Sequence, residues 1–122
     1  MKLVTLVAAL ASVASGYTVL DAQTFDSAIK EGYWLVKFYS STCPWSRRFA
    51  PVWEKVYTDL EETLAASDIK LAEVECKANR AVCDRAAIDG YPTVNFYDNG
   101  VNKGEVPGGQ SFQALTRFAM SI

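Results

Sequence analysis

The chain has 122 residues, half of them apolar, and a formal net charge of −2. This length and composition suit one domain with a hydrophobic core of its own. The slightly acidic balance, without any run of like charges, argues against nucleic acid as a partner. The sequence contains three cysteines and no histidine, so the usual general base and the commonest zinc ligand are missing. No cofactor or metal is implied, and any catalysis must depend on cysteine.

Residues 1–16 have the pattern of a secretory signal peptide: one basic residue, an apolar stretch, and small residues from Ala14 to Gly16. A membrane anchor is the alternative, but the apolar stretch is shorter than the roughly 20 residues that span a bilayer. We therefore expect a leader at 1–16 and a single mature domain at 17–122, with no membrane association after the leader is removed. The expected leader directs the chain to the secretory pathway, and because no KDEL-type signal stands at the end, both the endoplasmic reticulum lumen and secretion stay open. Both compartments permit disulfides.

The predicted mature domain alternates between strands and helices. Apolar runs, alternating patterns and the hairpin signal Asp98-Asn99-Gly100 predict strands at 17–20, 34–39, 69–75, 93–97 and 102–106. Helical spacing of apolar residues predicts helices between Thr24 and Gly32, over 45–66, over 79–87, and after Ser111. In the last helix, Phe112, Leu115, Phe118 and Ile122 are expected to face inward. The order βαβαβαββα predicts an α/β fold with a mixed central sheet and helices on both faces.

A cysteine stands where the second strand gives way to the second helix. The stretches Val36-Lys-Phe-Tyr-Ser-Ser-Thr-Cys-Pro-Trp-Ser46, Phe49-Ala-Pro51 and Gly90-Tyr-Pro-Thr93 together resemble a thioredoxin-fold domain of the protein disulfide isomerase family. The resemblance covers essentially the whole predicted mature chain. A lone C-x-x-S motif is weak, because short motifs recur by chance, but the joint spacing of the three stretches is specific. The resemblance implies the thioredoxin fold and a site at Cys43.

Cys43 also has a physical rationale as a reactive residue. It precedes a helix that begins near Pro44 or Trp45, where unpaired N–H groups and the helix dipole favour a thiolate. A structural, buried cysteine is the alternative, but a loop flanked by serine and threonine is a surface setting. Trp45 is predicted either to contact clients or to pack on its own helix.

The resemblance implies two further features. Pro92 is expected to follow a cis peptide bond, which places its loop beside the cysteine and offers the backbone of Tyr91 to an extended peptide; a trans turn proline is the alternative. Cys76 and Cys83 resemble a structural disulfide of this family, whereas the count of cysteines alone allows three pairings. Two reduced, buried cysteines are the alternative.

The sequence departs from the family pattern at the site itself. Ser46 replaces the second, resolving cysteine, and Lys37 stands where the family usually has a buried carboxylate that shuttles protons. Thr42 and Gln110 replace a usual tryptophan and a frequent arginine. Lys37 is expected to extend to solvent, or else to lower the pKa of Cys43 if its ammonium reaches the site. These departures argue against a dithiol oxidase or reductase.

Three functions remain open. The first is monothiol exchange with client polypeptides that carry cysteines, as a disulfide isomerase or a thiol-dependent escort, because one thiolate suffices to form a mixed disulfide. The second is a redox-inert module that binds peptides beside Tyr91 and Pro92. The third is a glutathione-linked enzyme similar to single-cysteine glutaredoxins.

Overall fold

The structure, a computed structural model, describes residues 12–14 and 17–122. Its strands are β1 (Ser12–Ala14), β2 (Tyr17–Leu20), β3 (Tyr33–Tyr39), β4 (Ile69–Glu75), β5 (Thr93–Asp98) and β6 (Val101–Glu105). Its helices are α1 (Phe25–Ala28), α2 (Pro44–Asp59), α3 (Glu61–Ala66), α4 (Arg80–Arg85) and α5 (Phe112–Met120). The predicted leader lies outside the described residues except for the three residues of β1, so the leader stays a prediction.

The strands form one mixed sheet in the order β1-β2-β4-β3-β5-β6. β2 and β3 both run parallel to β4, whereas β5 is antiparallel to β3 and β6 is antiparallel to β5. β3 has a partner on each side, which is why its sequence is a nearly continuous apolar run. The predicted hairpin joins β5 to β6, with Asn99 (φ 50°) and Gly100 (φ 86°) in the left-handed region that such turns require.

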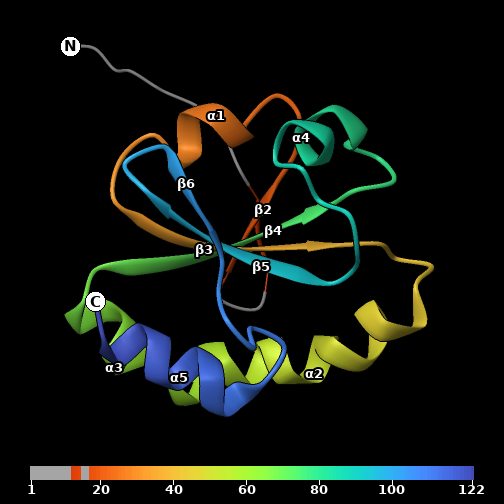
Figure 1. Cartoon of the computed structure of the whole chain (residues 1–122). Coiled ribbons are helices and arrows are strands. Elements are labelled where there is room, and N and C mark those ends of the chain that lie inside the picture. Colours follow the sequence, from red (N-terminus) through yellow and green to blue (C-terminus); the bar gives the residue numbers. More distant parts are fainter. Residues whose placement is uncertain (1–11, 15–16) are drawn as a thin grey trace, which may run out of the picture.

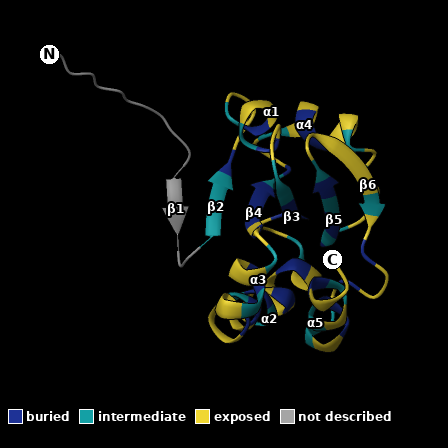
Figure 2. Ribbon diagram, turned by 90° about the vertical axis from the view of Figure 1, so that its left-hand side faces the viewer, coloured by how far each residue is buried: buried dark blue, intermediate teal, exposed yellow. Residues whose placement is uncertain are grey.

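Helices cover both faces of the sheet, as predicted (Figure 1). α1 and α4 lie on one face, and α2, α3 and α5 lie on the other. Because side chains alternate along a strand, Val36 and Phe38 of β3 join the core under α1 and α4. Leu35 points the opposite way and packs in the second core with Trp53 and Leu115. Figure 2 shows the resulting buried layer on the sheet and on the inner sides of the helices.

Two local predictions were wrong. The helix expected over 45–66 is broken at Leu60, whose φ of −110° and ψ of 16° separate α2 from α3. The apolar spacing gave no sign of the break, because Leu60 and Leu64 are both buried across it. Ile122, expected to face inward, is 36% exposed because α5 already ends at Met120.

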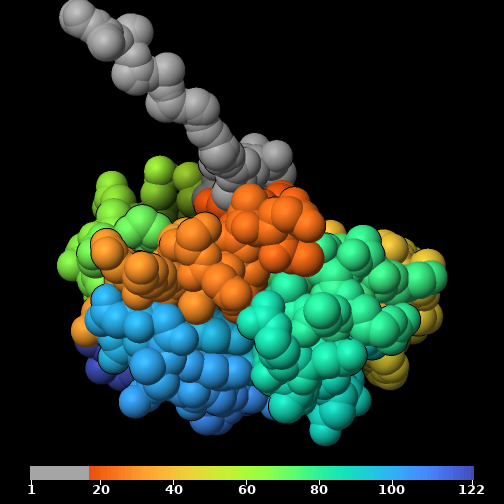
Figure 3. Space-filling view, turned by 90° about the horizontal axis from the view of Figure 1, so that it is seen from above, coloured from red at the N-terminus to blue at the C-terminus, as the bar shows by residue number. Residues whose placement is uncertain are grey.

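The arrangement of the strands gathers two loops at one end of the molecule. β3 and β4 run parallel with Tyr39 paired to Glu75, so the segments that follow both strands leave the sheet at the same edge. Figures 1 and 3 show that α4 and the start of α2 lie toward this same end of the molecule, on opposite faces of the sheet. Across residues 12–14 and 17–122, none of the helices is both long and apolar enough to cross a bilayer.

Candidate functional site

Cys43 is the N-cap residue of α2. The loop after β3 turns at Ser40, whose carbonyl accepts a hydrogen bond from the Cys43 N–H (3.0 Å). Cys43 has an extended backbone (φ −86°, ψ 124°), and its carbonyl accepts the first helical hydrogen bond, from the Arg47 N–H (3.1 Å). Pro44 occupies the first helical position, where the missing N–H costs nothing. The thiol is free and half-buried, so the structure places the predicted cysteine at an accessible helix start.

The surroundings of Cys43 favour its thiolate form. The backbone N–H of Ser46 is the main group that lowers the pKa of the Cys43 thiol, against a smaller opposing effect of burial. The N–H of Trp45, the Ser46 hydroxyl and the charge of Arg47 lower this pKa further. The neutral thiol makes no capping hydrogen bond to its own helix and instead points at the carbonyl of Tyr91 (Sγ to O, 3.9 Å). The first-turn N–H groups are therefore available to a negative charge on the sulfur.

Ser46 does more than occupy the place of a missing cysteine. Its side chain is buried, and its hydroxyl oxygen accepts a hydrogen bond from the backbone N–H of Ser40 (3.1 Å). The same hydroxyl also contributes to the lowered pKa of Cys43. Ser46 thus connects the turn after β3 to the thiolate. A serine hydroxyl can stabilise a thiolate by a hydrogen bond, but it cannot attack a disulfide.

The loop that leads into β5 lies beside the cysteine. The Tyr91–Pro92 peptide bond is cis, as the resemblance implied, and Pro92 is buried. The Tyr91 carbonyl faces the sulfur of Cys43. Gln110 holds this loop in place, because its side-chain amide donates a hydrogen bond to the carbonyl of Pro92 (Nε2 to O, 2.7 Å). Within the same loop, the Thr93 hydroxyl donates a hydrogen bond to the carbonyl of Gly90 (Oγ1 to O, 2.8 Å).

Trp45 is the large apolar side chain next to the cysteine. The residue as a whole is 62% exposed. The guanidinium of Arg48, one turn further along α2, lies 4.7 Å from the ring centroid. Packing on its own helix therefore involves only part of the indole, and most of the ring is free to meet another molecule. Its role as a client contact stays a prediction.

The structure joins Cys76 and Cys83, the pairing that the resemblance implied. The bridge links the end of β4 to α4, and it leaves Cys43 as the free thiol. Glu75, next to Cys76, braces the site loop against this disulfide loop. One of its carboxylate oxygens accepts from the N–H of Ser41 and the other from the N–H of Ala78, both at 2.8 Å. Partial burial has the largest single effect and raises the pKa of Glu75, but these hydrogen bonds, together with the charge of Lys77, outweigh it and lower the pKa below its ordinary value.

The expectation that Lys37 extends to solvent was wrong. Its side chain is 5% exposed, and its ammonium forms an ion pair with Glu73 on the neighbouring strand (Nζ to Oε1, 3.0 Å). The alternation along β3 explains this, because Lys37 faces the same side as Leu35 and lies over Trp53 (5.7 Å to the ring centroid). The ring of Tyr39 lies closer still, at 4.6 Å, and burial together with Glu73 raises the pKa of Tyr39 to about 12.

The lysine of this ion pair borders a cavity behind the site loop. The cavity has a volume of about 210 Å³ and is lined by Lys37, Tyr39, Ser40, Ser41, Ser46, Arg47 and Ala50. Lys37 thus reaches the back of the site, but the cationic side chain that acts on the pKa of Cys43 is Arg47. A direct effect of Lys37 on the thiol stays a prediction. Among the described residues, no group of three or more His, Cys, Asp or Glu is placed to hold a metal ion.

Sequence reasoning missed Glu73, Glu75 and Arg47. Glu73 is detectable in principle, since Lys37 interrupts an otherwise apolar strand and a buried charge requires a partner, which β4 can supply as Glu73 or Glu75. Choosing Glu73 over Glu75 needs the register in which Lys37 pairs with Glu73. Glu75 and Arg47 carried no local signal, because their contacts depend on how the loops meet.

Comparisons with known proteins agree with this geometry. A family model described as thioredoxin matches residues 16–121. The thioredoxin domain-containing protein 5 homolog of Drosophila melanogaster is 36% identical over 96 residues, which cover 77% of this chain and 23% of that protein. Protein disulfide-isomerase 5-1 of Arabidopsis thaliana is 32% identical over 104 residues, covering 83% of this chain and 68% of that protein.

Solved structures place the chain in the same group. A crystal structure of human ERp44 superposes with a TM-score of 0.79 and 27% identity, covering 90% of this chain and 30% of that one. The first two thioredoxin domains of Naumovozyma dairenensis Eps1p give a TM-score of 0.76 and 28% identity, over 82% of this chain and 38% of that structure. The chain spans about a quarter or less of the first curated relatives it matches. It belongs to the thioredoxin family, and its domain is a thioredoxin-fold domain of the protein disulfide isomerase type.

Proposed function

We propose that this protein carries out monothiol thiol–disulfide exchange with client polypeptides, through mixed disulfides at Cys43. The observation that supports this most is the placement of a free thiol at the start of α2, facing the carbonyl of Tyr91, with Ser46 where a second thiol would be needed. The relatives named as protein disulfide isomerases support the general chemistry. The predicted leader supports a place in the secretory pathway, where clients acquire their disulfides.

The first step needs nothing beyond the residues described. The Cys43 thiolate attacks one sulfur of a client disulfide, a new S–S bond joins the client to Cys43, and the second client sulfur leaves as a thiolate that takes a proton from water. No net oxidation or reduction occurs, because one disulfide replaces another. The N–H groups of Ser46 and Trp45 maintain the fraction of Cys43 that is ionised.

The second step depends on an outside thiol. In a dithiol relative, a second cysteine attacks the mixed disulfide with the high effective concentration of an intramolecular reaction. Ser46 cannot do so. Release follows attack by another client thiolate, which completes an isomerisation, or by an external thiol such as glutathione. A thiol-dependent escort is the limiting case in which release waits for the external thiol.

The experiment compares covalent complexes of the wild-type protein and Cys43→Ser in a secretory compartment. Cells are quenched with acid, free thiols are alkylated, and the protein is followed on gels with and without reductant. We expect high-mass bands in the wild type that collapse under reductant and are missing from Cys43→Ser. Such bands identify Cys43 as the attacking residue, since that residue alone distinguishes the two proteins.

Two other results would each overturn the proposal. Noncovalent client binding that is equal in both proteins, without reductant-sensitive bands, would make the chain a peptide-binding module of thioredoxin fold. A wild-type monomer that carries glutathione, with no client attached, would instead indicate a glutathione-linked enzyme. Intact mass measurement of the alkylated monomer separates these two outcomes.

A further inference from the structure

Several exposed cations lie at the end of the molecule that carries Cys43, and three of them, Arg47, Arg48 and Lys77, are here called the basic rim. None of the ion pairs between described residues involves any of them. Arg47 acts on the Cys43 thiol through its charge. Lys77 acts in the same way on Glu75, whose carboxylate holds the N–H of Ser41 two residues before the cysteine. The rim therefore has two cations at the start of α2 and one on the disulfide loop, which Glu75 joins to the site loop.

The negative charge near this rim is placed unevenly. Glu75 is half-buried, and both of its oxygens accept backbone hydrogen bonds. Asp89 is exposed and precedes Tyr91 by two residues, so it belongs to the cis-proline side of the cysteine. Residues 40–50, which form the site loop and the start of α2, contain no acidic residue. The α2 side is cationic, although the protein as a whole is slightly acidic.

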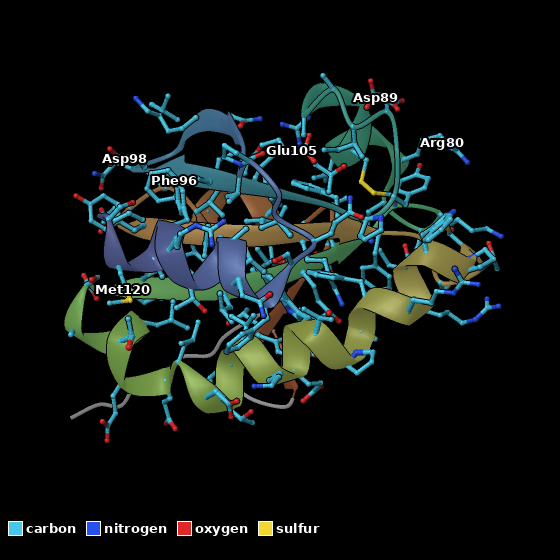
Figure 4. The ribbon with its side chains drawn as sticks, turned by 60° about the horizontal axis from the view of Figure 1, so that its bottom comes forward. Arg80, Asp89, Phe96, Asp98, Glu105 and Met120 are labelled. Atoms are coloured by element: carbon cyan, nitrogen blue, oxygen red, sulfur yellow. A yellow bond between two sulfur atoms is a disulfide. The ribbon has the colours of Figure 1, made fainter. Side chains whose placement is uncertain are left out.

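The same surface also offers apolar contact. Arg48 stacks over Trp45, which remains largely exposed. An indole beside a guanidinium presents a flat apolar face next to a planar group that binds carboxylates in a bidentate manner. Figure 4 shows that another cation, Arg80, lies at this end of the molecule, far from Asp98 and Met120 at the opposite end.

We propose that the basic rim selects client disulfides flanked by aspartate or glutamate on the side that faces α2. This inference rests on the proposed function and names the substrate class of the same site. Attack by Cys43 proceeds as described above, with one S–S bond formed and one broken. The rim adds attraction for an acidic client before and during this attack, because clustered surface charges raise the encounter rate of an oppositely charged partner.

The test uses peptides that carry one cysteine as a mixed disulfide with thionitrobenzoate. Attack by Cys43 joins the peptide to the protein and releases coloured thionitrobenzoate, the same leaving group for every peptide. Three peptides of equal length have flanking aspartates, asparagines or lysines. For the wild type we expect the aspartate peptide to react on the order of ten-fold faster than the lysine peptide at low salt. The ratio should fall to about two-fold or less at 1 M salt, where the screening length is about 3 Å.

Two triple variants separate the rim from net charge. In one, Arg47→Gln, Arg48→Gln and Lys77→Gln remove the rim. In the matched control, Lys30→Gln, Lys103→Gln and Arg117→Gln remove the same charge elsewhere. The readout is the ratio of the aspartate to the lysine rate, because Arg47 also affects the thiol and will change all rates together. We expect the ratio to approach one in the rim variant and to persist in the control.

The outcomes distinguish this inference from the function on which it rests. If Cys43 releases no thionitrobenzoate from any peptide, the proposed function fails. If all three peptides react at equal rates in the wild type, independently of salt, the exchange chemistry stands and the acidic preference is refuted. An equal loss of preference in both triple variants would also refute it, because the effect would then belong to overall charge.

Discussion

Lys37→Met provides a strong test of the buried ion pair behind the site. The Lys37 and Glu73 side chains are 5% and 11% exposed, with Nζ and Oε1 3.0 Å apart. Removing the lysine leaves Glu73 without its cation, with the Tyr39 hydroxyl at 3.5 Å as its remaining side-chain donor. Breaking a buried pair from one side costs about 3 to 5 kcal/mol of unfolding free energy. We expect a loss of this size in Lys37→Met.

Two further variants control this prediction. The double variant Lys37→Met with Glu73→Leu removes both charges, and we expect it to recover most of the loss, because apolar replacement of a buried pair is often neutral or stabilising. Lys55→Met breaks an exposed ion pair. The side chains of Lys55 and Asp59 in this pair are 56% and 48% exposed. The expected cost there is below about 1 kcal/mol.

The assay is urea unfolding at pH 7, followed by tryptophan fluorescence and by circular dichroism so that two-state behaviour is checked. The free energies of unfolding of the wild type and of the variants are compared at similar m-values. If Lys37→Met costs no more than Lys55→Met, the pair is not buried as described. If the double variant is as unstable as Lys37→Met, the cost arises from lost packing and not from an unpaired carboxylate.

Three other predictions concern the site and its brace. Ser46→Ala should raise the pKa of the Cys43 thiol, because the hydroxyl that helps to lower it is lost; the rate of alkylation against pH measures this effect. The same variant should lower the free energy of unfolding by about 1 to 3 kcal/mol, measured by urea unfolding, because the buried N–H of Ser40 loses its acceptor. In the wild type, the alkylation midpoint should lie below the value of about 8.5 for an ordinary thiol. The unfolded chain binds the proton of the Cys43 thiol more tightly than the folded chain does, so the free energy of unfolding should rise with pH between the folded and the unfolded pKa values of this thiol. Cys43→Ser is the control, and its free energy of unfolding should not change with pH over this range. Replacing Cys76 and Cys83 by alanine should lower stability by about 2 to 3 kcal/mol on the chain-entropy model, and an unchanged urea midpoint would show that the bridge does not constrain the unfolded chain.

Local sequence patterns predicted most of the fold because most of its elements carry a local signal. Strands β3, β4 and β5 follow apolar or alternating runs, and the Asn99-Gly100 turn is made of residues that accept a left-handed backbone. The break at Leu60 escaped prediction because the apolar spacing runs through it without interruption. Such a break is determined by packing of two helices on the sheet, which a local pattern does not contain.

The features of the site that depend on adjacent residues could be predicted, whereas contacts between residues that are remote in sequence could not. The position of Cys43 before a helix could be read from adjacent residues. The loop of Tyr91 and Pro92 was placed beside it by resemblance. The role of Lys37 could not be foreseen, because solvent exposure of a lysine depends on whether a neighbouring strand supplies a carboxylate. The brace from Glu75 to Ser41 likewise joins two loops that are remote in sequence.

The lifetime of an isolated mixed disulfide tests the central claim most directly. A peptide is coupled to Cys43 through a disulfide, the complex is purified, and its decay is followed by mass spectrometry in the wild type and in Ser46→Cys. We predict that the wild-type complex persists without added thiol and decays at a rate proportional to added glutathione. The Ser46→Cys complex should release its peptide unaided, as an intramolecular disulfide forms. Spontaneous release from the wild type, at a rate similar to that of Ser46→Cys, would contradict the monothiol account.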